Sequence, residues 1–107
     1  MKIYEGCEAL IGNTPLLKIS KFVKSEARLY AKIEAANPAG SVKDRVALYM
    51  INAAERDGRL KKGGTVIEPT SGNTGIGICM ICAVRGYNAV IVMPSNMSRE
   101  RIMTMKA

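Results

Sequence analysis

A lysine at the predicted start of a helix is the first residue whose position suits chemistry. Lys43 lies in the segment Asn37 to Arg45 and follows Ser41, which can cap a helix. The unpaired N–H groups and the dipole of a first helical turn disfavour positive charge, so they favour the neutral amine. A neutral lysine can attack an aldehyde and take a proton from a carbon atom. The alternative is an ordinary exposed lysine beside Asp44, and position alone favours that alternative.

A polar loop between a predicted strand and a predicted helix is the second candidate. The loop reads Thr70, Ser71, Gly72, Asn73, Thr74, Gly75. Its hydroxyl and N–H groups converge on the carboxyl edge of a sheet, which is a favourable place for an anion. The order of its glycines matches neither G-x-G-x-x-G nor a P-loop, so a carboxylate or phosphate is expected rather than a nucleotide. The alternative is a plain strand-to-helix turn that is rich in helix-capping residues.

Other kinds of catalytic site are excluded or disfavoured by the composition. The chain has no histidine, which excludes Ser-His and Cys-His nucleophiles and the usual imidazole metal sites, and we expect no metal. The acidic residues are not paired as a glycosidase requires. Cys79 and Cys82 have C-x-x-C spacing, but they lie in the middle of a predicted helix. We therefore expect them to be buried core cysteines.

Hydrophobic periodicity and turn residues predict the elements that position these groups. We expect strands over Leu16–Ile19, Leu29–Ile33, Thr65–Glu68 and Ala89–Met93, helices over Val42–Asp57 and Asn73–Arg85, and a third helix from Ser98. Gly58 and Gly86 stand where glycine commonly ends a helix. The alternation of strands and helices predicts an α/β fold with a parallel sheet and helices on both faces.

Bulk properties indicate an ordinary globular domain. A chain of 107 residues suits one domain that buries roughly 65% of its unfolded surface. The net charge of +7 is scattered and lacks interleaved aromatic residues, so we expect no nucleic-acid partner. The three cysteines form no disulfide framework and no secretory signal is evident, which predicts a cytoplasmic protein. The apolar stretch from Gly75 to Val84 is too short to span a membrane.

The joint order of four motifs resembles one known family. The motifs are Asn13-Thr14-Pro15-Leu16, the segment 37–45 (NPAGSVKDR), the segment 68–75 (EPTSGNTG) and the segment 93–98 that begins Met93-Pro94 and ends Met97-Ser98. They resemble cysteine synthases (O-acetylserine sulfhydrylases), which are fold-type-II, tryptophan synthase β-like enzymes that use pyridoxal 5'-phosphate. The resemblance spans nearly the whole chain but only the N-terminal portion of the family's fold. It implies an N-terminal segment over about 1–40 and part of the small α/β domain over about 41–107, so the chain is expected to be truncated.

The resemblance also assigns roles to the candidate residues. It makes Lys43 the lysine that binds the cofactor as a Schiff base and also the acid and base. It makes Asn73 a hydrogen-bond partner of the cofactor's ring oxygen. The substrate carboxylate would be gripped by Thr70, Ser71, Gly72, Asn73 and Thr74. The implied reaction eliminates acetate from O-acetylserine and adds sulfide, which yields L-cysteine. Family members are usually homodimers, and some are bound by serine acetyltransferase.

The family's glycine-rich phosphate cradle lies later in the fold, so this chain alone is expected to be inactive.

Three alternatives to a cysteine synthase stay open. Relatives of the same fold, including cystathionine β-synthase, serine or threonine dehydratase and threonine synthase, would share the motifs in part. A catalytically dead fragment could serve only as a folding or interaction module, since unpaired strand edges seek partners. Nucleic-acid binding through the positive charge is the least favoured reading.

Overall fold

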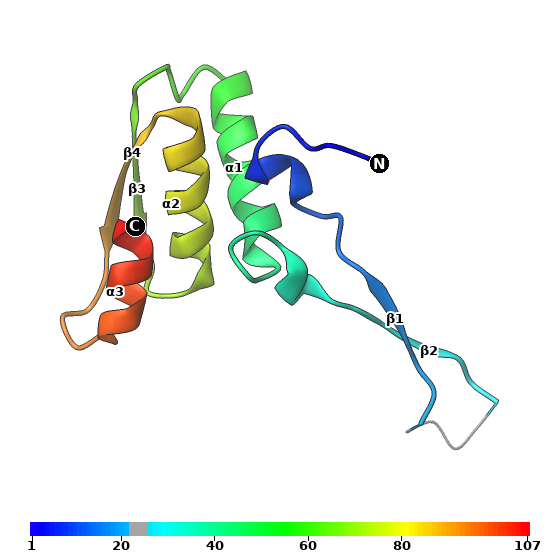
Figure 1. Ribbon diagram of the computed structural model, residues 1–107. Coiled ribbons are helices and arrows are strands. Elements are labelled where there is room, and N and C mark those ends of the chain that lie inside the picture. Colours follow the sequence, from blue (N-terminus) through cyan, green and yellow to red (C-terminus); the bar gives the residue numbers. More distant parts are fainter. Residues whose placement is uncertain (22–25) are drawn as a thin grey trace.

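The computed structural model describes residues 1–21 and 26–107. Figure 1 shows the order of its elements. These are the short 3-10 turn η1 (Cys7–Leu10), strands β1 (Leu16–Ile19) and β2 (Leu29–Lys32), the turn η2 (Glu34–Ala36), helix α1 (Lys43–Arg56), strand β3 (Thr65–Pro69), helix α2 (Asn73–Arg85), strand β4 (Asn88–Val92) and helix α3 (Arg99–Lys106). Every strand and helix expected from the sequence is present, with ends within one residue of the prediction.

The strands form two separate sheets. β3 and β4 pair in parallel, with Val66 opposite Ala89 and α2 as the crossover between them. This pair carries the predicted parallel α/β pattern. β1 and β2 instead pair antiparallel, from Leu16 opposite Lys32 to Ile19 opposite Leu29. The chain between them is too short for the crossover that a parallel pair requires, so the two strands fold back as a hairpin. In Figure 1 this hairpin projects away from the helices.

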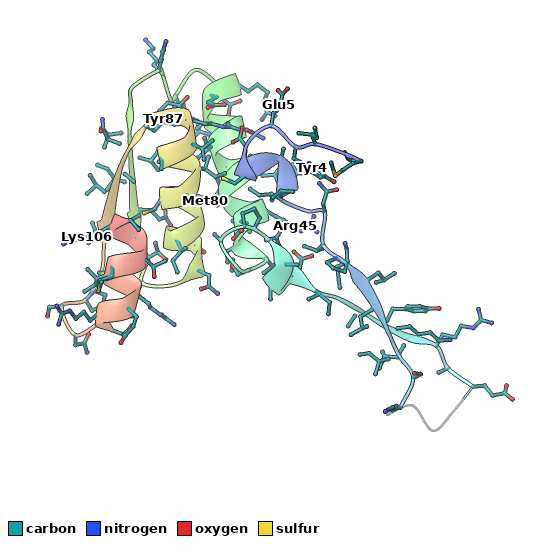
Figure 2. The ribbon with its side chains drawn as sticks, viewed as in Figure 1. Tyr4, Glu5, Arg45, Met80, Tyr87 and Lys106 are labelled. Atoms are coloured by element: carbon teal, nitrogen blue, oxygen red, sulfur yellow. The ribbon has the colours of Figure 1, made fainter. Side chains whose placement is uncertain are left out.

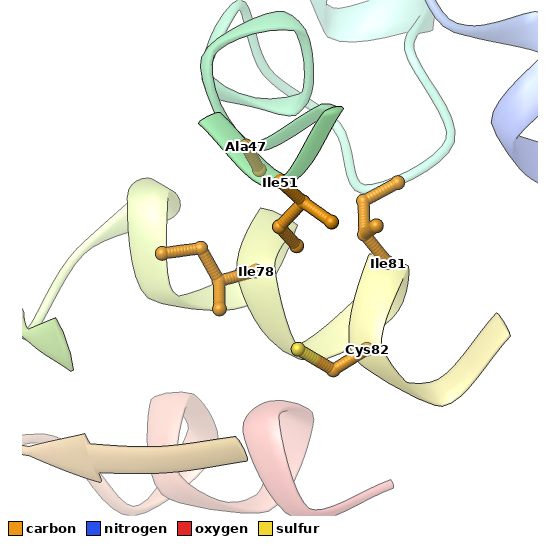
Figure 3. Packing of buried hydrophobic residues seen from close by; sticks show 5 residues of the cluster. All are labelled: Ala47, Ile51, Ile78, Ile81 and Cys82. Atoms are coloured by element: carbon orange, nitrogen blue, oxygen red, sulfur yellow. The ribbon is translucent and has the colours of Figure 1, made fainter. Parts of the chain in front are cut away.

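The core lies between α1 and α2. α2 packs on the β3–β4 sheet, and α1 packs on α2 (Figure 1). Within the described residues, the fully buried apolar side chains all come from these two helices, and Figure 3 shows their packing. They are Ala47, Ile51, Ile78, Ile81 and Cys82. On α2 the buried residues follow helical spacing, which explains why the apolar pattern identified this helix from sequence.

The helix ends follow the signals in the sequence. The hydroxyl of Ser41 accepts a hydrogen bond from the N–H of Lys43 at 3.1 Å, at the start of α1. Gly58 and Gly86 follow α1 and α2 with φ angles of 71° and 73°. This left-handed conformation is disfavoured for residues with a Cβ atom, so glycine ends both helices where it was expected. The hydroxyl of Ser98 caps α3.

The chain buries less surface than its length predicts. Its accessible surface is 7712 Å², against about 5,800 Å² for a compact monomer of this mass. Roughly 54% of the unfolded surface is therefore buried instead of the expected 65%. On β3 and β4, the side chains that point away from α2 stay open: Ile67 is 65%, Val90 46% and Val92 55% exposed. Within the described residues, α2 covers one face of this sheet and leaves the other uncovered. None of the helices described is long and apolar enough to cross a membrane.

Candidate functional site

Lys43 is the first residue of α1, and its side chain is exposed. Its neighbour Asp44 is fully buried. The Asp44 Oδ2 atom accepts a hydrogen bond from the N–H of Ala39 at 2.6 Å, while Oδ1 has no partner. No ion pair joins Lys43 to Asp44 in the part of the chain that is described. The Lys43 amine is therefore open to solvent, which does not distinguish a reactive lysine from an ordinary exposed one.

A network of side chains holds the turn that leads into Lys43. The carboxylate of Glu34 accepts two hydrogen bonds from the guanidinium of Arg45, at 2.8 and 2.9 Å, and one from the hydroxyl of Thr14 at 2.7 Å. These bonds lower the pKa of Glu34 from 4.5 to about 2, mainly through Arg45. The same pairing raises the pKa of Arg45. Figure 2 shows Arg45 between the N-terminal segment and α1. The pair therefore links η2 and α1 to the segment just before β1.

Asn37 connects this network to the residues just before Lys43. It is 3% exposed, and its side-chain amide donates to the carbonyl of Ser41 at 3.0 Å and to Glu34 at 2.9 Å. Its Oδ1 atom accepts the N–H of Gly12 at 2.9 Å. A buried amide with all these partners fixes the local backbone, since leaving any of these groups unpaired would be costly. Two of the sequence motifs, at residues 13–16 and 37–45, are thus held together next to the backbone of Lys43.

The loop Thr70–Thr74 presents polar groups that have no partner within the described residues. The N–H of Thr70 continues the sheet by donating to Val92, and its hydroxyl accepts the N–H of Gly72 at 3.3 Å. α2 begins at Asn73 without a side-chain cap. The side chains of Ser71, Asn73 and Thr74 and the N–H groups of these residues are therefore left for a ligand. An open hollow of about 670 Å³ lies beside the loop, between the ends of β3 and β4. A loop that only capped the helix would use one of these side chains.

A close contact between α1 and α2 brings the backbone of Lys43 to Gly77, one turn into α2 from this loop. Gly77 lies one turn after Asn73 and is buried. The Cβ atom of an alanine at this position would lie 3.2 Å from the carbonyl oxygen of Lys43 and 3.1 Å from Cβ of Ala47. Glycine thus lets the two helices approach at their first turns. Lys43 and the loop Thr70–Thr74, which are separate candidates in the sequence, therefore belong to adjacent helix starts.

Several contributing residues were missed in the sequence. Glu34 and Thr14 give no local signal, because their partner Arg45 lies far along the chain. Arg101 donates from Nη1 to the carbonyl of Ser71 at 2.9 Å, which ties α3 to the loop. Such contacts depend on tertiary packing, so no spacing rule reveals them.

Of the C-x-x-C pair, Cys82 is the buried core residue that was expected, whereas Cys79 is only partly buried. Cys82 is 1% exposed and Cys79 is half-buried, and neither forms a disulfide. Burial raises the pKa of both thiols, and the neighbouring Cys79 raises that of Cys82 further. The thiolate needed for redox or nucleophilic chemistry is therefore disfavoured.

A family model described as "Pyridoxal-phosphate dependent enzyme" matches residues 8–107. A cysteine synthase from Staphylococcus aureus strain Mu50 is 54% identical over 107 residues, covering 99% of this chain and 34% of that protein. A cystathionine beta-synthase from Apis mellifera is also 54% identical, covering 99% of this chain and 22% of that protein. The chain thus spans about a third or less of the length of these relatives.

Solved structures agree with these matches. The crystal structure of a hydrogen sulfide-producing enzyme from Fusobacterium nucleatum superposes with a TM-score of 0.93 at 49% identity, over 99% of this chain and 35% of that one. The fold is therefore that of fold-type-II enzymes in part, as the sequence predicted. Taken with the match over residues 8–107, this shows that the chain belongs to the family of pyridoxal-phosphate dependent enzymes.

Proposed function

We propose that the protein carrying this chain is a pyridoxal-phosphate-dependent cysteine synthase, which replaces the acetate of O-acetylserine with sulfide to form L-cysteine. The observation that carries the proposal is the pairing of two helix starts. One presents the exposed amine of Lys43, and the other presents the unpartnered polar loop Thr70–Thr74. The 54% identity to a cysteine synthase over the chain supports the choice of reaction.

The residues present fit part of the cofactor. The Lys43 amine is exposed and free of ion pairs in the described chain, so it can bond to the cofactor's aldehyde carbon. Asn73 is exposed at the start of α2, and its amide can donate to the oxygen on the cofactor ring. The cofactor's phosphate would be held by residues outside this chain. When bound, pyridoxal phosphate supplies an electron sink for negative charge at the substrate Cα atom.

The loop would hold the amino-acid substrate. A carboxylate suits the N–H groups of Asn73 and Thr74, because the first N–H groups of a helix lack intrahelical partners and the helix dipole favours an anion. The remaining residues of the loop lie next to this proposed carboxylate site: Thr70, Ser71, Gly72 and the side chain of Thr74. Binding the carboxylate at several points orients the Cα–H bond toward the base.

Lys43 would move the proton. Its neutral amine removes the proton from the substrate Cα atom, which allows acetate to leave from Cβ. Sulfide then bonds to Cβ, and Lys43 returns the proton to Cα. The atoms balance as O-acetylserine plus hydrosulfide (HS−) giving cysteine plus acetate. Asn37 and Arg45 support this role indirectly, because they hold the backbone on both sides of Lys43.

The experiment is an assay of the full-length protein with pyridoxal phosphate, O-acetylserine and sulfide. We expect L-cysteine and acetate in equal amounts, and loss of both in Lys43→Ala. Lys62→Ala removes an exposed lysine away from the site and serves as the control. Unchanged cysteine formation in Lys43→Ala would contradict the assignment.

A second candidate uses the same site with another acceptor. The 54% identity to a cystathionine beta-synthase is as high as that to the cysteine synthase. The loop and Lys43 alone therefore do not determine whether sulfide or homocysteine is the acceptor. Supplying homocysteine in place of sulfide separates the two. Cystathionine as the main product would favour the second candidate.

Other features of the whole protein stay predictions. A homodimer, binding of serine acetyltransferase and a cytoplasmic location are expected from the resemblance and from the free cysteines. The division near residue 40 into an N-terminal segment and part of an α/β domain also stays a prediction. It is supported by the projecting hairpin of β1 and β2, which lies apart from α1 and α2 (Figure 1).

A further inference from the structure

The third helix contacts the proposed substrate loop through a charged side chain. Arg101 on α3 donates from Nη1 to the carbonyl oxygen of Ser71 at 2.9 Å. The same peptide group is held from its other side, because the N–H of Gly72 donates to the hydroxyl of Thr70 at 3.3 Å. The Ser71 carbonyl and the Gly72 N–H belong to the same planar peptide unit, so the two bonds together fix its orientation.

The fixed peptide unit directly precedes the groups that would bind a carboxylate. Asn73 and Thr74 follow Gly72, and their N–H groups have no partner within the described chain. Rotation of the Ser71–Gly72 peptide would swing these N–H groups away from a shared point. Arg101 therefore contacts the peptide group that precedes the loop's donors and touches none of the donors themselves.

The same helix meets the loop at a second point. Met105 lies one turn after Arg101, on the same side of α3. The Cβ atom of an alanine at Gly75 would lie 3.0 Å from Cε of Met105 and 2.7 Å from Cγ2 of Thr70. α3 thus packs against both ends of the loop, one end through a hydrogen bond and the other through an apolar contact.

We propose that Arg101 is a positioning residue, which sets the loop Thr70–Thr74 in the orientation that binds the substrate carboxylate. The proposal rests on the proposed function for the carboxylate, but the contact with Ser71 stands without it. Arg99 offers a matched comparison: it carries the same charge on the same helix, is exposed, and has no partner within the described residues.

The first test measures substrate binding by the full-length, cofactor-loaded protein. The probe is L-alanine, which has the amino and carboxylate groups but no leaving group, and its Kd is read from the visible absorbance of the bound cofactor. We expect Arg101→Ala to raise the Kd about three- to tenfold, as for loss of one charge-assisted hydrogen bond. Arg99→Ala should leave the Kd unchanged, and Arg101→Lys should recover part of the loss.

The second test does not depend on any ligand. Amide hydrogen exchange of residues 71–74 should be faster in Arg101→Ala than in Arg99→Ala, while exchange in the buried part of α2 stays the same. Equal exchange and equal Kd in the two variants would overturn the proposal. If the wild-type protein gives no response to L-alanine, the proposed function fails, and the exchange rates alone then decide whether Arg101 positions the loop.

Discussion

The carboxylate of Glu34 and the guanidinium of Arg45 meet at two points, with Nε to Oε2 at 2.8 Å and Nη2 to Oε1 at 2.9 Å. Arg45 is two residues after the proposed catalytic Lys43. The same guanidinium also donates to the carbonyl of Gly12 at 3.1 Å. Since paired, parallel hydrogen bonds fix both position and orientation, the start of α1 is held against the N-terminal segment.

This pair predicts a pH-dependent loss of stability. The pKa of Glu34 is lowered from 4.5 to about 2, chiefly by its bonds to Arg45 and Thr14. A lowered pKa in the folded state gives stability that is present above pH 4.5 and is lost as the pH falls toward 2. Urea unfolding should therefore show that Glu34→Gln is less stable than wild type at pH 6, and that the difference shrinks between pH 4.5 and 2. Glu5→Gln is the control at an exposed position. A difference that stays constant with pH would contradict the pairing.

The contact of α1 with α2 predicts that Gly77→Ala is destabilising. Alanine favours a helix by up to about 1 kcal/mol over glycine. At this position, however, its Cβ would press on Cβ of Ala47 at 3.1 Å and on the carbonyl of Lys43 at 3.2 Å. Neither atom is the end of a flexible side chain, so we expect a net loss of about 1–2 kcal/mol in the free energy of unfolding. Gly72→Ala meets nothing within 4 Å and should have little effect on stability. A stabilised Gly77→Ala would show that the helices are not in contact there.

Arg85 joins three elements near the end of α2. Its guanidinium bonds to Glu8 at 2.9 Å, Asn52 at 2.8 Å and Glu55 at 2.8 Å, and its side chain is 18% exposed. Figure 2 shows that the neighbouring Tyr87, which donates to Glu55 at 2.7 Å, lies at this end of α2. Truncation of the Arg85 side chain would remove the hydrogen bonds to Glu8, Asn52 and Glu55.

We therefore expect Arg85→Gln to lower the free energy of unfolding by about 1–3 kcal/mol. Arg56→Gln is the comparison, since Arg56 pairs with Asp57 at 3.4 Å on an exposed surface and should cost at most about 0.5 kcal/mol. Chemical denaturation of both variants measures the difference. Equal losses would mean that the Arg85 contacts add nothing beyond a surface ion pair.

The thiol of Cys82 is predicted to be unreactive. The residue is 1% exposed, and burial together with Cys79 raises its pKa. A thiol reagent at pH 8 should modify Cys82 at least about tenfold more slowly than a free cysteine, because less thiolate is present and access is blocked. Cys82→Ala should leave the fast phase of modification unchanged in the native protein, whereas all thiols react in urea. Disappearance of the fast phase in Cys82→Ala would contradict the buried position.

Local elements were predictable because each carries its own signals. The predicted bounds of helix α2 agree with the observed ones, because Gly86 terminates the helix and its apolar residues follow the helical period. The antiparallel hairpin was outside the predicted pattern, although the connection between Ile19 and Leu29 is too short for a parallel crossover and was a signal available in the sequence. The low burial also escaped prediction, since Val90 and Val92 look like core residues in sequence whether or not anything covers them.

The candidate site was predictable in its parts but not in its arrangement. Lys43 and the loop from Thr70 carry local signals at helix starts. Their closeness depends on Gly77, and the support of the loop depends on Arg101, which is thirty residues beyond Ser71. These relations arise from packing of α1, α2 and α3, which a single sequence does not report.

The central claim is that Lys43 is the residue that bonds to pyridoxal phosphate. The most direct measurement is borohydride reduction of the full-length protein with the cofactor present, followed by peptide mass analysis to locate the attached group. The account predicts that the cofactor's mass is found on the peptide containing Lys43. In Lys43→Ala, no other single lysine should carry the label. A label fixed on a different lysine, with Lys43 unmodified, would contradict it.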